Sequence, residues 1–239
     1  MQYELFYWPG IQGRGEFVRL AFEDAGAAYR DVAREAGGES VLMALLDDKS
    51  LVRPPFAPPF LKADEILIGQ TANILHFLGP RLGLAPEAEA DRLWLHQLQL
   101  TVADVVAEAH DSHHPVSVSE YYEDQREEAM RRAADFTASR IPKYLHYFEN
   151  VLARNPSGME WVIGSTASYV DLSLFQLLEG LHYAFPNAMA RLAPALPQLE
   201  SLRRRVAKRP RIAAYLKSER RLPFNEQGIF RRYPELDAT

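Results

Sequence analysis

The sequence predicts an α/β domain built on a mixed four-stranded sheet, followed by an all-α domain. Strand and helix patterns alternate from the N-terminus to about Gly83, and two short apolar runs in this part flank the turn residues Ala63-Asp64-Glu65. From Glu87 onward there are long helical patterns and no convincing strand. A chain of 239 residues is long enough for two small domains, and its composition, 47% hydrophobic and 25% charged, is ordinary for a globular protein.

The first part has the element order of a thioredoxin-like fold, β-α-β-α-β-β-α. Aromatic and β-branched runs indicate its strands, and apolar residues at helical spacing indicate its helices. The first strand, helix and second strand follow one another closely, which favours a βαβ unit with parallel strands. The predicted elements are a strand at Tyr3–Trp8, a helix from Gly15 to a capping Gly26, a strand at Ala28–Val32, a weak helix at 39–47, a proline-rich loop at 48–59, a hairpin of Phe60–Lys62 and Ile66–Ile68, and a helix from Thr71.

The second part is predicted to be helical throughout. Its proposed helices lie at 87–110, 119–154, Leu172–Leu181, Pro197–Ala207 and Pro210–Ser218. Ser168 and Asp171 have the spacing of a capping box before the third of these helices, and proline near the first turn suits the last two. The tail, Leu222–Thr239, shows no period. We therefore divide the chain into residues 1–83 and 87–239.

Composition excludes several classes of protein. The net charge of −5 argues against nucleic-acid binding, because phosphate contacts need a basic surface. The chain has no cysteine, which removes disulfides, thiolate metal sites and cysteine nucleophiles. The N-terminus lacks the pattern of a signal peptide, and no apolar run approaches the length of a membrane span. A cytoplasmic protein without a membrane partner is the expectation.

The stretch from Pro58 to Thr71 is a candidate anion-binding corner. The Pro58-Pro59 bond is a candidate cis peptide, and Thr71 is a plausible N-cap for the helix that follows the hairpin. Free N–H groups at such a helix N-terminus attract a carboxylate. On this stretch alone, an ordinary hairpin running into a helix explains the pattern equally well.

Tyr7 is a candidate catalytic residue at the end of the first strand. Strand aromatics are usually packed in the sheet, but a hydroxyl here can also face the loop before the first helix. Arg14 stands near the start of that helix. A nearby cation would favour the ionised form of Tyr7 or strengthen its hydroxyl as a hydrogen-bond donor.

Taken together, these features resemble the glutathione transferases, most closely the tyrosine-type classes (alpha, mu, pi and sigma). The resemblance covers most of the chain. In the first part, the matching features are a tyrosine followed by an arginine-containing loop (Tyr7–Arg14), a cis-proline (Pro59), the hairpin, and a Gln-Thr helix start at the family's spacing (Gln70-Thr71). In the second part, they are a late capping box (Ser168–Asp171) and an aspartate on the first long helix (Asp104).

The resemblance implies a role for each matched residue. Tyr7 would donate a hydrogen bond to the glutathione sulfur, with Arg14 supporting it. Gln70 and Thr71 would hold the γ-glutamyl carboxylate, and Asp104 of the partner subunit in a homodimer would pair with the γ-glutamyl ammonium. Lys49 or Arg53 would meet the glycyl carboxylate.

Three departures from the family pattern affect this site. The aromatic groups usual for the glycyl end are not obvious before Lys49. The loop from Tyr7 to Arg14 is one residue longer than usual, and Gln12 stands where arginine is common. Pro58 stands where the family uses both backbone groups to clasp the cysteinyl part of glutathione, beside Pro59. Because proline has no N–H, one such bond is missing.

A pocket for a hydrophobic electrophile is expected between the domains. Trp8 and Ile11 would line one wall, and His110, His114 and Tyr121 the other. The histidines His110, His113 and His114 also suggest a metal, but no supporting carboxylate set accompanies them, and an exposed helix end is the commoner explanation. Three aromatic residues of the tail would either fold over the pocket or only anchor the tail: Phe224, Phe230 and Tyr233.

The resemblance implies a detoxifying transferase that conjugates glutathione, as co-substrate and without a metal, to a small hydrophobic electrophile. A glutathione-dependent isomerase or peroxidase shares the same glutathione site. A non-catalytic binding protein that kept the fold is the other alternative, motivated by Pro58 and the longer loop.

Overall fold

The computed structural model describes residues 1–238 and confirms a mixed four-stranded sheet. The strands β1 (Tyr3–Phe6), β2 (Arg30–Asp31), β3 (Phe60–Ala63) and β4 (Ile66–Gly69) lie in the order β2-β1-β3-β4. β1 pairs with β2 in parallel and with β3 antiparallel, and β3 and β4 form the predicted hairpin. β2 is shorter than predicted, because Val32 already begins a 3₁₀ turn.

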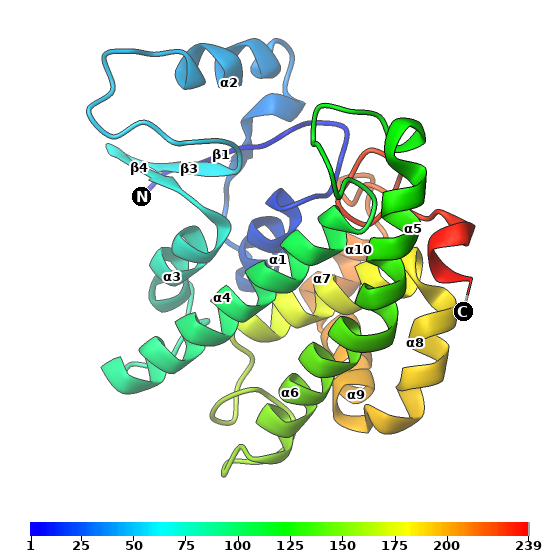
Figure 1. Cartoon of the computed structure of the whole chain (residues 1–239). Coiled ribbons are helices and arrows are strands. Elements are labelled where there is room, and N and C mark those ends of the chain that lie inside the picture. Colours follow the sequence, from blue (N-terminus) through cyan, green and yellow to red (C-terminus); the bar gives the residue numbers. More distant parts are fainter. Residues whose placement is uncertain (239) are drawn as a thin grey trace.

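Helices cover both faces of this sheet, as Figure 1 shows. Alternating side chains of each strand point to opposite faces. Leu5 and Leu61 pack against α1 (Gly15–Ala25) and α3 (Thr71–Arg81), whereas Phe6 and Phe60 pack on the other face beside α2 (Gly38–Leu46). The end of β1 and the starts of α1 and α3 therefore meet at one edge, where the candidate site lies.

The second part consists of helices arranged around α7 (Tyr169–Ala184), which is buried along most of its length. The other helices of this part are α4 (Glu89–Asp111), α5 (Arg126–Asp135), α6 (Ile141–Ala153), α8 (Pro186–Leu192), α9 (Pro197–Ala207) and α10 (Pro210–Leu216). Of these, α4, α8 and α9 contact α7 directly. The sequence did not predict α8.

The single helix predicted at 119–154 is wrong, because the structure divides it. A 3₁₀ turn at Tyr122–Gln125 precedes α5, and a π-helical turn at Phe136–Arg140 separates α5 from α6. Pro142 has no N–H to give to the carbonyl one turn before it, so the regular ladder is interrupted where the π turn forms.

The predicted capping box at the start of α7 is confirmed. The Ser168 N–H and hydroxyl donate to the Asp171 carboxylate, and the Asp171 N–H donates to the Ser168 hydroxyl. Burial raises the pKa of Asp171 to about 6. The Tyr169 N–H donates to the Leu84 carbonyl, so this helix start also fixes the segment between α3 and α4.

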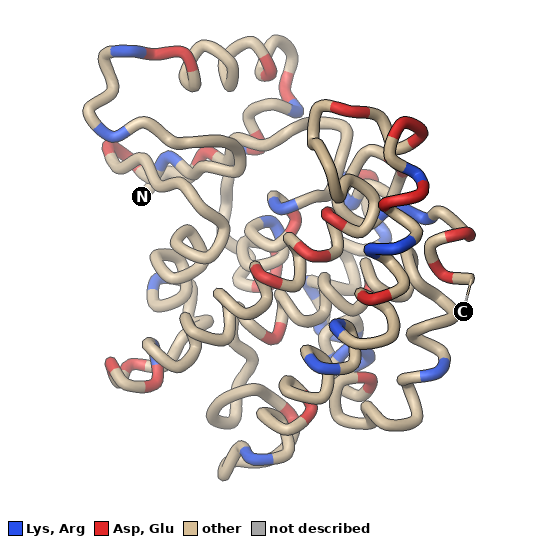
Figure 2. Tube along the Cα trace, viewed as in Figure 1, with Lys and Arg blue, Asp and Glu red and all other residues tan. Residues whose placement is uncertain are grey.

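The two parts share one apolar core and several ion pairs. Phe17, Leu20 and Leu75 belong to the same buried cluster as the residues of α7. Arg209, at the start of α10, pairs with Asp24 of α1 at 2.5 and 2.7 Å. Figure 2 shows that basic and acidic residues are interspersed over the helices. The division at 83/87 falls in the segment between α3 and α4 and stays a prediction. Within residues 1–238, no helix is both long and apolar enough to cross a lipid bilayer.

Candidate active site

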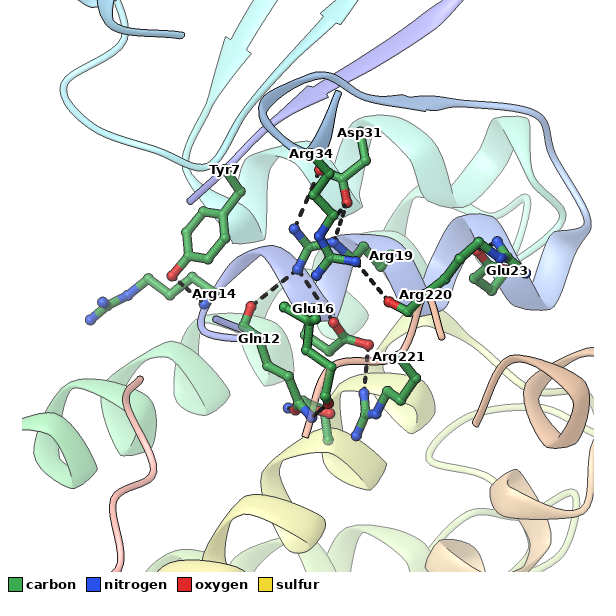
Figure 3. A network of polar contacts seen from close by, with 12 residues as sticks. Tyr7, Gln12, Arg14, Glu16, Arg19, Glu23, Asp31, Arg34, Arg220 and Arg221 are labelled. Carbon is green, nitrogen blue, oxygen red and sulfur yellow. Dashed lines mark hydrogen bonds and ion pairs between the residues drawn. The ribbon is translucent and has the colours of Figure 1, made fainter. Parts of the chain in front are cut away.

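Tyr7 follows β1 directly and is held by the loop that leads into α1. Its side chain is only 4% exposed, and its hydroxyl oxygen accepts a hydrogen bond of 2.8 Å from the Arg14 backbone N–H (Figure 3). Gly13 and Gly15 leave room for the tyrosine ring, since a Cβ at Gly13 would lie 2.0 Å from the hydroxyl oxygen. The loop thus fixes the hydroxyl through an acceptor bond and leaves its proton for donation.

The pKa of Tyr7 is raised above its ordinary value. Burial raises it, and this effect outweighs the Arg14 N–H bond and the charges of Arg14 and Arg19, which lower it. Tyr7 is therefore a neutral phenol at neutral pH. Of the two effects expected from a nearby cation, the geometry favours the hydrogen-bond donor over the ionised form.

The backbone of Arg14, rather than its guanidinium, touches the Tyr7 hydroxyl. In Figure 3 the Arg14 side chain extends away from the tyrosine. It lines a cavity of about 360 Å³ together with Gln70 and Thr71. The structure therefore brings three predicted residues together, and Tyr7 is joined to them through Arg14.

At the hairpin corner the predicted cis peptide is present, but the N-cap of α3 differs from the predicted one. The Pro58-Pro59 peptide is cis, and Pro59 is buried at the start of β3. The prediction that Thr71 is the N-cap is wrong, because α3 begins at Thr71 and Gln70 precedes it with a φ of 67°. The side chain of Gln70 does not cap the helix, so the N–H groups of its first turn keep their capacity to bind an anion.

Two residues of α4 that the sequence analysis missed also line this cavity, His96 and Gln99. Within the described residues, Thr71 Oγ1, His96 Nδ1 and Gln99 Oε1 are buried without a hydrogen-bond partner. Buried polar atoms are normally satisfied, so these three atoms are available to hydrogen-bond a polar ligand. A glutamine at an apolar position of the α4 pattern was the available signal, since Gln99 is 1% exposed.

The remaining glutathione-site candidates lie outside this cavity. Lys49 and Arg53 are exposed on the loop between α2 and β3. Asp104 is exposed on α4, one turn beyond the cavity residue Leu100. Their roles stay predictions.

The tail packs against the loop between β1 and α1, beside the region where an electrophile pocket is expected. Trp8 and Ile11 are half-buried and His114 is buried, whereas Tyr121 is 78% exposed. Tail side chains leave a cavity of only about 10 Å³ against Gln12 and Gly13. The cavity beside Arg14, Gln70 and Thr71 contains none of the five residues assigned to the electrophile pocket.

Aromatic contacts anchor this tail on the helical part. Phe224 stacks on Tyr183 with ring centres 5.0 Å apart, Tyr233 stacks on Tyr122 at 3.9 Å, and Phe230 packs over Gly180. These contacts confirm that the tail is anchored, and its covering of a pocket stays a prediction.

His110, at the C-terminal end of α4, and His113 and His114 just after it have structural partners. His113 is bonded to the Ile229 carbonyl at 2.8 Å and to the ring of His114. Burial is the main cause that lowers the pKa of His113 to about 3, so it is neutral. Among residues 1–238, no group of side chains has the geometry of a metal site.

A larger cavity, of about 560 Å³, lies away from the candidate site. It is bounded by Trp94 near the start of α4, Tyr147 of α6 and the loop before α7. It contains none of the predicted site residues.

Comparisons with known proteins agree with the geometry. The family model described as "Glutathione S-transferase, C-terminal domain" matches residues 110–219. Glutathione S-transferase P 10 of Caenorhabditis elegans is 28% identical over 224 residues, which cover 91% of this chain and 91% of that protein. Glutathione S-transferase P 1 of Xenopus laevis is 25% identical over 228 residues, which cover 92% of this chain and 93% of that protein.

A solved structure supports the same fold. The pi-class glutathione S-transferase of Onchocerca volvulus has a TM-score of 0.72 at 21% identity, covering 95% of this chain and 99% of that one. The family model, the relatives and this fold together show that the chain is similar to glutathione S-transferases over most of its length, and they support an enzyme of that kind.

Proposed function

We propose that the protein conjugates the thiolate of glutathione to a hydrophobic electrophile, and that the Tyr7 hydroxyl stabilises the thiolate. The observation that carries this proposal is the fixed Tyr7 hydroxyl, which accepts from the Arg14 N–H and remains free to donate. A thiol with an ordinary pKa of about 8.5 is mostly protonated at neutral pH. A hydrogen bond to the sulfur favours the thiolate, which is the nucleophile.

In this mechanism the thiol proton leaves to solvent, and the thiolate attacks an electrophilic carbon. A carbon–sulfur bond forms, and the leaving group departs with its electron pair. The protein contributes the donor at the sulfur and holds the two reactants together, which lowers the entropic part of the barrier.

The α3 corner is the proposed cradle for glutathione. The first-turn N–H groups after Gln70, with Arg14 beside them, offer positive charge to the γ-glutamyl carboxylate. Thr71 would add its hydroxyl. In this proposal Asp104 reaches the γ-glutamyl ammonium of the neighbouring subunit in a homodimer, and the enzyme works in the cytoplasm as a detoxifying transferase.

Substitution of Tyr7 by phenylalanine tests the proposal. Removal of one donor to a developing anion typically costs about 10²–10³-fold in turnover, so we expect a loss of kcat of that order. Calorimetry with glutathione is expected to give a Kd within about tenfold of the wild-type value, since one hydrogen bond is lost. Full activity of Tyr7→Phe with every electrophile tried would remove Tyr7 from its role.

Pro58 favours a second candidate, a glutathione-transferase fold that binds without catalysis. Its missing N–H costs roughly 0.5–1.5 kcal/mol of ligand binding, or up to about tenfold in affinity. Such a loss weakens the cradle without abolishing it. If the wild-type protein gives no heat of binding at millimolar glutathione, this second candidate replaces the transferase.

A further inference from the structure

The loop between β1 and α1 is held at its centre by the buried side chain of Gln12. The Gln12 amide N–H donates to the Leu222 carbonyl in the tail, and its amide oxygen accepts from Gln176 of α7 at 2.8 Å. The Gln12 backbone carbonyl accepts from the Glu16 N–H at 3.0 Å and from Arg19 at 3.3 Å. Gln12 is 5% exposed, and one residue thus joins three elements that are distant in the sequence.

The tail grips the same loop at a second point. Asn225 donates its side-chain N–H to the Gly10 carbonyl at 2.9 Å. We call the bonds from Leu222 and Asn225 to this loop the tail clamp. Beside it, Arg221 pairs with the fully buried Glu16 of α1 at 2.5 Å, as Figure 3 shows.

The residues after Gln12 control the Tyr7 hydroxyl. Gly13 has a φ of 44° and lies so close to the tyrosine that any Cβ would collide with its oxygen. Arg14 then supplies the 2.8 Å bond to that oxygen. Because hydrogen bonds weaken steeply as distance and angle change, a small shift of the loop alters this bond.

We propose that Gln12 is a positioning residue for thiolate formation. It joins the tail and α7 to the loop, so that the Arg14 N–H holds the Tyr7 hydroxyl where it meets the glutathione sulfur. This inference rests on the role proposed for Tyr7. Gln12 does not touch the sulfur and acts only through the loop.

The substitution Gln12→Met tests this role. Methionine keeps the length and apolar stem of glutamine but neither donates nor accepts a strong hydrogen bond. We expect the midpoint of the kcat–pH profile to rise by about one pH unit, and kcat at a pH below both midpoints to fall about tenfold. The KM for glutathione is expected to stay within about threefold, because the α3 cradle is untouched.

Gln125→Met is the matched control. Gln125 is as buried as Gln12, at 1% exposed, and also donates and accepts through its amide, at 2.8 Å to the Ser117 carbonyl and 2.9 Å from the Val116 N–H. It holds a different loop. A general loss of stability lowers the melting temperature of both variants, but only Gln12→Met is expected to move the pH profile. Gln176→Met breaks the same link from α7 and serves where Gln12→Met does not fold.

A second readout keeps the inference separate from the proposed function. The protein is labelled with 3-fluorotyrosine, and the Tyr7 resonance is identified by its loss in Tyr7→Phe. Gln12→Met is expected to shift this fluorine resonance in the glutathione-free protein, whereas Gln125→Met leaves it in place. An unchanged resonance together with an unchanged pH profile overturns the role of Gln12. A shifted resonance in a protein whose Tyr7→Phe variant is fully active overturns the proposed function instead.

Discussion

Two glycines of the β1–α1 loop differ in the space around them, since Gly13 is crowded by Tyr7 and Gly10 is open. A Cβ built on Gly13 would lie 2.0 Å from the Tyr7 oxygen, and its φ of 44° disfavours a side chain in any case. A Cβ on Gly10 would meet nothing within 4 Å. The same chemical change therefore has different consequences three residues apart.

At this scale we predict that Gly13→Ala lowers kcat at least about tenfold, because the methyl group displaces the Tyr7 hydroxyl, which stabilises the thiolate in the proposed function. The strained φ should also destabilise the fold by about 1–3 kcal/mol. Gly10→Ala is the control, with kcat and melting temperature close to those of the wild type. Equal activity of the two variants would show that the position of the hydroxyl is not critical.

Glu108 joins four elements of the helical part. This residue of α4 accepts from Arg132 of α5 at 3.2 Å, from Arg140 of the π turn at 2.6 Å and from the Tyr144 hydroxyl of α6 at 2.7 Å. These partners, with Arg140 foremost, lower the pKa of Glu108 to about 2. The π turn before Pro142 thus places the Arg140 guanidinium against the Glu108 carboxylate.

At the scale of elements we predict that Glu108→Gln destabilises the protein by about 1–2 kcal/mol at pH 7, measured by urea unfolding. The folded-state pKa is lower than the unfolded one, so the ion pair contributes stability above about pH 4.5 and loses it as the pH falls toward 2. The difference in the free energy of unfolding between variant and wild type should therefore shrink as the pH falls from about 4.5 toward 2. Glu128→Gln, an exposed carboxylate of α5, is the control, and a gap independent of pH would contradict the ionic explanation.

The whole molecule leaves large apolar side chains on its surface. Phe56 and Val52, on the loop between α2 and β3, are 94% and 93% exposed. On α4, Leu93 and Leu100 are 61% and 48% exposed, and Asp104 lies one turn farther along. Exposed apolar groups of this size favour a protein partner, and the role proposed for Asp104 requires that partner to be a second copy of the chain.

At this scale we predict a homodimer by sedimentation velocity at micromolar concentration, and a monomer for Phe56→Glu, because burying a carboxylate at an interface is costly. Met159→Glu, at a half-exposed methionine between α6 and α7, should stay dimeric. A monomeric wild-type protein would remove both the dimer and the role of Asp104.

The features that local chemistry determines were predictable from the sequence. The hairpin follows from two apolar runs around a turn, and the capping box of Ser168 and Asp171 follows from spacing and residue type. Gly26 ends α1 in the left-handed conformation, as a capping glycine should.

Features that depend on distant residues were not predictable. The hydrogen bond from Gln12 to Leu222 joins residues that are 210 positions apart, and no periodicity in the tail predicts it. Burial, rather than the neighbouring arginines, decides that the pKa of Tyr7 shifts upward, and burial is a property of the folded molecule. The prediction that Thr71 is the N-cap was wrong because Gln70 adopts a positive φ that its residue type does not suggest.

The tail clamp also bears on protein synthesis. Gly10 and Gln12 precede their tail partners Asn225 and Leu222 by 215 and 210 positions. Because translation proceeds from the N-terminus, the tail clamp cannot form until those later residues have been synthesised. A product that terminates before Leu222 carries Tyr7 without the clamp, so Tyr7 is synthesised long before the contacts that complete its surroundings.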